Sequence, residues 1–265
     1  MKGKIIGLLY LFMLFLAAGC EKEIDIEYHD IEPILVIEGS LTQDGAEVAL
    51  TLTTPMDEPF TNIFLTDAKV SISDLTVSES FELQPDSRGI FISSVKGVVG
   101  HSYRLDVERG GEKYSAVSAM LPPTVITGME FSWIKMPYDE VAVLQVSFTD
   151  DSDLKGERYW LRLYRNGKAY KWTTVSDHLS SGGIIDEVMM TSRRDLDEED
   201  EKDKLEEGDV VTALLAPVSQ EMHDYLEALS VGNSNGPRMF QGSFCLGYFL
   251  AAPVSTQSIL FPAYE

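Results

Sequence analysis

Short segments in which apolar and polar residues alternate recur along this chain, and this alternation constrains its fold most. Residues 47–52, 68–73 and 103–107 place apolar side chains at every second position. Successive side chains of a β-strand point to opposite faces, so each segment would bury one face and leave the other in water. Gly110-Gly111 and Asn166-Gly167 lie between such segments and predict tight hairpins. The sequence therefore predicts an all-β fold that begins with an Ig-like β-sandwich.

Two adjacent prolines divide the predicted body. Pro122 and Pro123 cannot donate backbone hydrogen bonds to a sheet. They predict a boundary between a β-sandwich domain at residues 34–121 and a second β-rich domain at residues 124–265. In the second domain we expect one short helix from about Ser219 to Leu229, with Ser219 as its N-cap.

The N-terminus has the charged, apolar and small-residue order of a secretory signal. Lys2 and Lys4 precede an apolar stretch at residues 5–16, and three small residues lead to Cys20. The apolar run is shorter than the ~20 residues that a transmembrane helix needs, so residues 1–19 are predicted to be a cleaved signal peptide. The small residues match a bacterial lipobox and predict Cys20 as the lipidated first residue of the mature protein. An ordinary secreted protein with a chance cysteine here is the alternative.

Acidic residues outnumber basic ones, 43 to 21, and the net charge is −22. Such a chain repels nucleic acid, which we exclude as a partner. Residues 20–33 begin with a cluster of acids and predict a tether between the lipid and the body. Cys245 lies in an apolar stretch and is expected to be a small buried side chain, so neither a disulfide framework nor a cysteine-based zinc site is predicted.

Two loop motifs suggest chemistry at first sight. Ser234 lies in a G-x-S-x-G pattern, but a predicted helix precedes it and Pro237 follows it, whereas a nucleophile elbow needs a strand before and a helix after. Asp151 and Asp153 resemble the start of a calcium loop, yet Lys155 takes a ligand position and Arg162 the place of the bidentate glutamate. We interpret both segments as ordinary loops.

The remaining polar and aromatic residues do not predict a catalytic or metal site. The acidic run at residues 195–209 lacks a central glycine that would fold it round an ion, so a water-facing loop is favoured over a cation or partner site. His223 and Asp224 are adjacent on the predicted helix and are not expected to face each other. No catalytic residue, metal site or cofactor is predicted, and the chain is expected not to be an enzyme. Three tryptophans offer an aromatic platform or core packing: Trp133, Trp160 and Trp172.

A series of short motifs spans nearly the whole mature chain. They are Ile24-Asp25-Ile26 behind Cys20, Leu35–Gly39, Asp67–Ile72, Gly100–Leu105, Tyr159 with Leu161, Gly208-Asp209-Val210, Tyr225-Leu226, and Gly242 with Leu246–Phe249. In this order they resemble the domain-of-unknown-function 4249 family of Bacteroidetes lipoproteins, which are encoded beside TonB-dependent receptors. The resemblance implies an outer-membrane lipoprotein and assigns no activity. The acids behind Cys20 also resemble an export signal to the cell surface, with the periplasmic face as the alternative.

Two functions follow as expectations. The first is a non-enzymatic accessory lipoprotein, anchored in the outer membrane through Cys20, that works with a TonB-dependent receptor or another surface complex. The second is a surface lipoprotein that binds a glycan or peptide on an aromatic platform.

Overall fold

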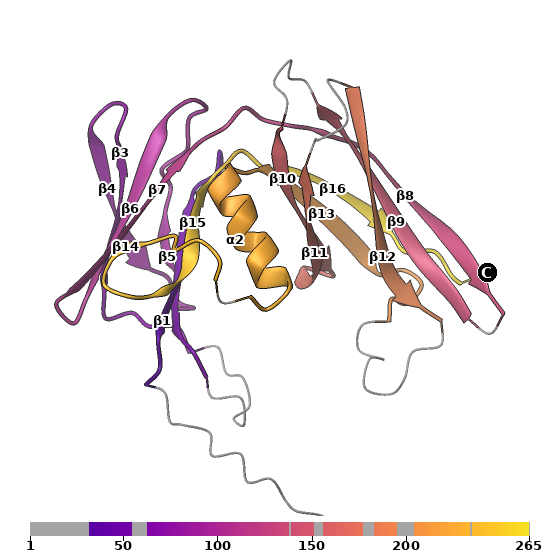
Figure 1. Cartoon of the computed structure of the whole chain (residues 1–265), viewed down its shortest axis with the longest axis horizontal. Helices are drawn as coiled ribbons and strands as arrows, with labels where there is room; N and C mark the ends of the chain where they lie inside the picture. The colour runs from indigo at the N-terminus through magenta and orange to yellow at the C-terminus, as the bar shows by residue number, and fades with distance from the viewer. Residues whose placement is uncertain are drawn as a thin grey trace, which may run out of the picture. The chain divides into compact units, whose positions relative to one another are not determined.

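A computed structural model describes residues 32–54, 63–137, 139–150, 156–176, 183–194, 204–233 and 235–264. Pro33–Glu265 forms one compact unit. The predicted signal peptide and Cys20 lie outside the described residues. The described part holds strands β1–β16 in three sheets and one helix, α2, so the prediction of an all-β fold with one short helix is confirmed (Figure 1).

The largest sheet has the order β14-β7-β6-β3-β4-β5-β2-β1-β15. Its strands are β1 (Leu35–Leu41), β2 (Ala46–Leu52), β3 (Lys69–Asp74), β4 (Glu79–Pro85), β5 (Phe91–Ser93), β6 (Ser102–Arg109), β7 (Glu112–Ala119), β14 (Gln241–Gly242) and β15 (Leu246–Ala251).

The two ends of this sheet fold over one shared core, which makes the first β-sandwich. Ile37 on β1 and Ile72 on β3 are fully buried in the same hydrophobic cluster. The strands approach closely across it, because a Cβ atom on Gly39 would lie 2.8 Å from Cδ2 of Leu105 on β6. The alternation seen in the sequence supplies the inward face of each layer.

The remaining strands form a second sandwich of two antiparallel sheets, ordered β11-β10-β13-β16 and β12-β9-β8. Phe148 and Leu161, one from each sheet, are fully buried in one cluster. Asn166 and Gly167 both have positive φ angles, +50° and +79°, as the predicted hairpin requires. The strands are β8 (Ile126–Met136), β9 (Asp139–Asp150), β10 (Arg158–Arg165), β11 (Lys168–Ser176), β12 (Gly183–Arg193), β13 (Val210–Pro217) and β16 (Ser255–Leu260).

The C-terminal part of the chain serves both sandwiches. β15 pairs in parallel with β1, and β14 pairs with β7, so residues 241–251 complete the first sandwich before β16 joins the second. Figure 1 shows β15 beside β1. This differs from the expected contiguous division at Pro122 and Pro123, because strand pairing depends on spatial proximity and these two strands return from residues expected in the second domain.

Helix α2 (Gln220–Ser230) lies where the sequence predicts it. Oγ of Ser219 accepts a hydrogen bond from the backbone N–H of Met222 at 3.2 Å, which is an N-cap. Met222 and Leu226 are buried in a cluster that also contains Trp160 of β10 and Leu250 of β15. The helix therefore packs against strands of both sandwiches.

Candidate interaction surface

The three-stranded sheet β12-β9-β8 carries apolar side chains on both of its faces, although Gln145 and Ser147 of β9 are polar residues of the outer one. On β9, Ala142, Leu144 and Val146 point into the core of the second sandwich. The alternate residues Val141 and Val143 lie on the opposite face, outside that core, and are also buried. An antiparallel sheet that covers one core commonly has a polar outer face, so this outer face is unusual.

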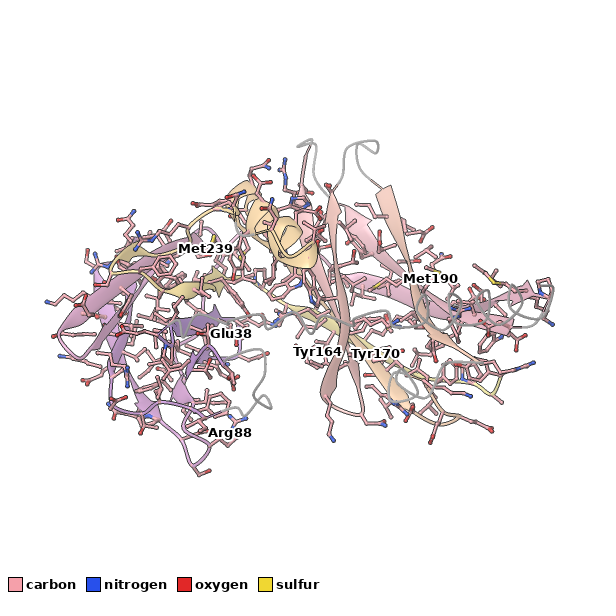
Figure 2. All side chains as sticks on the ribbon, turned by 60° about the horizontal axis from the view of Figure 1, so that its bottom comes forward. Glu38, Arg88, Tyr164, Tyr170, Met190 and Met239 are labelled. Carbon is pink, nitrogen blue, oxygen red and sulfur yellow. The ribbon has the colours of Figure 1, made fainter. Side chains whose placement is uncertain are left out.

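Neighbouring strands extend the apolar character of this outer face. Strand register places Met190 and Ser132 on either side of Val143, and Arg193 and Ile134 on either side of Val141. The largest exposed fractions of the apolar side chains on this face are 68% for Met190 (Figure 2), 65% for Ile184, 56% for Val188 and 49% for Met136, followed by 46% for Ile134. We call the outer side of β12-β9-β8, with these side chains, the outer apolar face. Contiguous exposed apolar surface of this kind marks interaction sites.

The first sandwich provides a contrast within the same chain. Its outer surface over β3, β6, β7 and β14 carries a row of polar residues, in which Ser71, Asp106, Ser115 and Gln241 lie side by side. These residues line a shallow polar groove. Because this solvated face has the ordinary polar composition, the outer apolar face is a local feature of the second sandwich.

A groove separates β11 from β12, the edge strands of the two sheets. It is lined by Tyr170, Trp172, Glu187, Met189 and Ser230, among others. The Tyr170 hydroxyl donates to the backbone carbonyl of Thr191, and Nζ of Lys171 donates to that of Met190 at 3.3 Å. Side chains of β11 therefore close one end of the groove, while the strands themselves are not hydrogen-bonded to each other as a ladder.

Acidic side chains border the outer apolar face and the groove. Asp186 lies on the exposed side of β12, where its carboxylate accepts a hydrogen bond from Oγ of Ser147 at 2.5 Å. Burial raises the pKa of Glu187, which points toward the groove. Glu130 lies opposite Gln145 on the exposed side of β8. Within the described residues neither Glu130 nor Glu187 forms an ion pair, so this fringe is negative.

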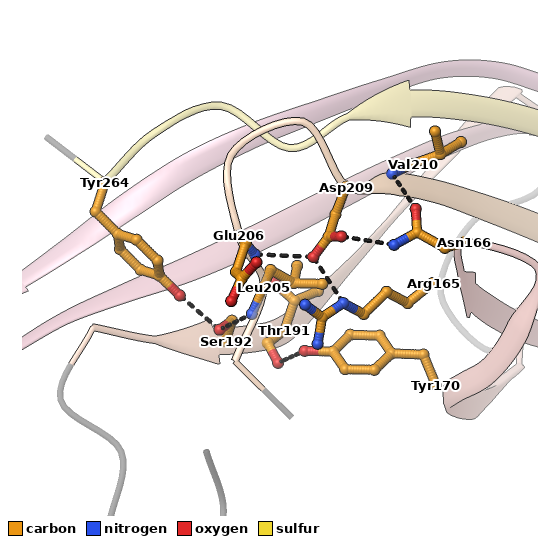
Figure 3. Close-up of polar contacts among 10 residues, drawn as sticks. All are labelled: Arg165, Asn166, Tyr170, Thr191, Ser192, Leu205, Glu206, Asp209, Val210 and Tyr264. Carbon is orange, nitrogen blue, oxygen red and sulfur yellow. Dashed lines mark hydrogen bonds and ion pairs between the residues drawn. The ribbon is translucent and has the colours of Figure 1, made fainter. Parts of the chain in front are cut away.

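The described end of the acidic run, residues 204–209, is anchored to the second sandwich. Burial alone would raise the pKa of Asp209, but hydrogen bonds from the Glu206 N–H and Asn166 Nδ2, together with Arg165, lower it. The donor atoms lie 2.8, 2.6 and 2.6 Å from its carboxylate oxygens (Figure 3). Leu205 is fully buried. The water-facing loop expected for the run is therefore wrong for Leu205 and Asp209, whereas residues 206–208 between them are exposed; residues 195–203 lie outside the described residues.

The tryptophans do not form one platform. Trp133 packs in the core of the second sandwich, with its ring centroid 5.6 Å from that of Phe261. Trp160 is buried on the other side of β10, where its centroid lies 6.2 Å from that of Trp172. Arg162, which fills the glutamate position of the calcium-like motif, places its guanidinium 4.2 Å above the Trp160 ring. Aromatic packing therefore accounts for two different clusters.

Other candidates from the sequence are placed as follows. Ser234 and the aspartates 151 and 153 lie outside the described residues. Nδ1 of His223 lies 3.6 Å from Oδ1 of Asp224, which is too far for a hydrogen bond, and it is buried without a hydrogen-bond partner among the described residues. Burial raises the pKa of Cys245 to about 11, which agrees with a small buried side chain. Among the described residues there is no metal-binding cluster, and no helix long and apolar enough to span a bilayer.

Sequence reasoning missed a histidine–carboxylate pair at the edge of the first sandwich. Nδ1 of His101 lies 2.7 Å from Oδ2 of the buried Asp74, and these residues are 27 positions apart. Burial alone would raise the pKa of Asp74, but hydrogen bonds from His101 and from the N–H groups of Thr76 and Val77 lower it. No local pattern predicts this pairing.

The Asp74 pair predicts an acid-sensitive contribution to stability. A carboxylate whose pKa is lower in the folded state stabilises fully above its unfolded pKa of 3.8, and the contribution is lost as the pH falls through the folded pKa. We therefore expect Asp74→Asn to lower the free energy of unfolding at pH 7 and to weaken its decline below about pH 4. Urea unfolding between pH 2.5 and pH 7 measures this. If the free energy of unfolding of the wild type and of Asp74→Asn fell equally below about pH 4, the stabilising role of the Asp74 carboxylate would be contradicted.

The fold and this surface define an all-β protein built from two β-sandwiches, one of which has an apolar outer face. Residues 21–258 match the family described as "Domain of unknown function (DUF4249)". The chain belongs to this family, and the resemblance found in its sequence motifs is confirmed.

Other comparisons give distant likenesses. No curated protein matches the chain. A segment of two fibronectin type-III domains from chicken tenascin aligns with 71% of this chain and 92% of its own length, at 12% identity and a TM-score of 0.23. The dimeric latent PorU of Porphyromonas gingivalis aligns over 93% of this chain at 11% identity and a TM-score of 0.25. The chain spans 21% of the PorU chain.

Proposed function

We propose that this protein is an outer-membrane lipoprotein, anchored through lipid on Cys20, that acts as a non-enzymatic accessory to a membrane partner such as a TonB-dependent receptor. The observation that carries the accessory role is the outer apolar face, because apolar surface exposed on a chain of net charge −22 fits a protein partner. The acids behind Cys20 favour display on the outside of the cell.

The anchor is supported by the N-terminal sequence and by the extent of the family match. The family alignment begins at residue 21, directly after the lipobox cysteine. One acyl chain gives marginal membrane binding, whereas several give stable binding, since each buried CH₂ contributes about 0.8 kcal/mol. A lipid on Cys20 would thus hold the body at the membrane without a spanning segment.

The rival proposal is a surface protein that binds a glycan or peptide on aromatic side chains. Trp160 is covered by Trp172 and by Tyr248, whose ring centroid lies 5.4 Å from that of Trp160. A ring packed in this way offers little flat surface to a sugar. The outer apolar face supports protein docking better than this cluster supports a sugar platform.

The anchor is tested by Cys20→Ala. We expect the wild-type protein to sediment with the outer membrane and to incorporate labelled palmitate, and the variant to lose the label and fractionate as soluble material. Cys245→Ala is the matched control, because it removes the other cysteine and should leave both properties unchanged. Membrane retention of Cys20→Ala at the wild-type level would contradict a lipid anchor at this residue.

A further inference from the structure

We infer that the partner contributes an extended, apolar segment with basic flanks, and that this segment adds to the free edge of β12 as a fourth, antiparallel strand. The inference rests on the proposed function, since it specifies how the outer apolar face and its adjoining edge bind their partner. Such strand addition combines main-chain hydrogen bonds, which give affinity, with side-chain contacts, which give specificity.

The backbone of β12 has hydrogen-bonding groups directed toward the open edge. The carbonyl of Met190 accepts from Lys171 of β11, so it faces away from β9. Backbone direction alternates along a strand, so the N–H and C=O groups of Val188 and Asp186 face the same way. No described residue hydrogen-bonds to the backbone groups of these two residues on that side. An unpaired row of this kind is a template for another strand.

The other edge of the same sheet, β8, is occupied at its first residue. β8 lies beside β16, and the N–H of Ile126 donates to Oγ of Ser255 at 3.0 Å. The edge of β12 instead borders the groove that faces β11. A strand added there would direct one set of side chains toward Trp172 and Met189. The alternate set would extend the outer apolar face beside Val188 and Met190.

The charge at the border of the docking site indicates which kind of partner segment can bind there. The border of the docking site carries Glu130, Asp186 and Glu187 against one lysine, Lys171, so it is net negative. Two copies of a chain with net charge −22 repel each other, which disfavours pairing of β12 with the β12 of a second copy. An apolar segment flanked by lysine or arginine complements both the border and the central apolar side chains. Antiparallel addition continues the arrangement of the three existing strands.

Photo-crosslinking in cells tests the geometry. A benzophenone amino acid is placed at Val188 or Met190 of the full lipidated chain, and at Val117 as a control. Val117 is 58% exposed on the first sandwich, against 56% for Val188. We expect positions 188 and 190 to crosslink to one segment of one partner. The two partner residues that they reach should be two positions apart, and the one reached from position 190 should come first in the partner's sequence, as antiparallel pairing requires. Val117 should give no such adduct.

The outcomes separate the two proposals. Partner adducts without the two-residue spacing would overturn strand addition and leave docking through this face standing. Adducts only to lipid, only to a second copy of the chain, or none at all would overturn both strand addition and docking here. The Cys20→Ala fractionation reports on the anchor independently of these results.

A backbone variant tests the edge directly. The N–H of Val188 faces away from β9, so Val188→Pro removes a donor to the partner without removing a bond to β9, in a position where an edge strand tolerates proline. We expect the yield of the Met190 crosslink to fall at least tenfold. Val188→Thr keeps the N–H and the branched shape and should retain most of the yield. Equal yields from the two variants, with unchanged urea midpoints, would overturn strand addition. If Val188→Pro does not fold, the residue spacing of the crosslinks still decides.

Discussion

Replacement of Asp209 by alanine is expected to lower the free energy of unfolding by about 3 to 5 kcal/mol. The buried carboxylate accepts hydrogen bonds from Arg165, Asn166 and the Glu206 N–H. These contacts tie the hairpin between β10 and β11 to the segment that leads into β13. Hydrogen bonds to a buried charge contribute more than those between neutral groups, so their joint loss is costly.

Urea denaturation followed by tryptophan fluorescence measures this effect. Asp106→Ala is the control, because it removes an acid whose ion pair with Arg104, 2.7 Å long, lies on the exposed surface. Exposed pairs contribute about 0 to 1 kcal/mol. If Asp209→Ala lowered the free energy of unfolding no more than Asp106→Ala does, burial of the Asp209 contacts would add nothing to stability.

Replacement of Gly247 by alanine is expected to cost about 3 kcal/mol or more. Gly247 has φ +105°, and a Cβ atom there would lie 2.0 Å from the backbone oxygen of Ile37. The added methyl group would force β15 away from β1, because the obstacle is backbone and cannot rotate aside. The parallel pairing that completes the first sandwich would be disturbed over its length.

Gly111→Ala separates the two causes of this expected loss. Gly111 has a similar φ of +88°, but a Cβ atom there would meet nothing within 4 Å. The control should cost about 1 to 2 kcal/mol for the backbone conformation alone. The difference between the variants, measured by thermal and urea unfolding, reports the close approach of β15 to β1. If Gly247→Ala and Gly111→Ala lowered the free energy of unfolding equally, β15 could move away from β1 without loss of stability.

The sequence predicted the parts of the fold that local chemistry controls. Asn166-Gly167 predicts its hairpin because both residues tolerate positive φ, and Ser219 predicts the start of α2 because its hydroxyl accepts from a free N–H group. The pairing of β15 with β1 could not be predicted, since parallel partners can lie anywhere along the chain. It depends on packing of the completed core.

The outer apolar face was missed for a related reason. Alternation of apolar and polar residues identifies strands that have one solvent-exposed face. In β12, by contrast, apolar residues are adjacent: Ile184 with Ile185, and Met189 with Met190. One member of each pair points outward and the other inward. Adjacent apolar residues in a strand, without alternation, could have indicated that β12 is apolar on both sides. The predicted lipidation site at Cys20 lies outside the described residues and stays a prediction.

The return of β15 to β1 also affects how the protein is made. Gln43, just after β1, exchanges two hydrogen bonds with Val254, which lies 211 positions later in the chain. Contacts between such distant residues form slowly, because a long loop must close first. While residues 246–251 are still being synthesised, the first sandwich lacks an edge strand and exposes part of its core. We therefore expect the emerging chain to depend on a chaperone until residues 246–251 have paired with β1.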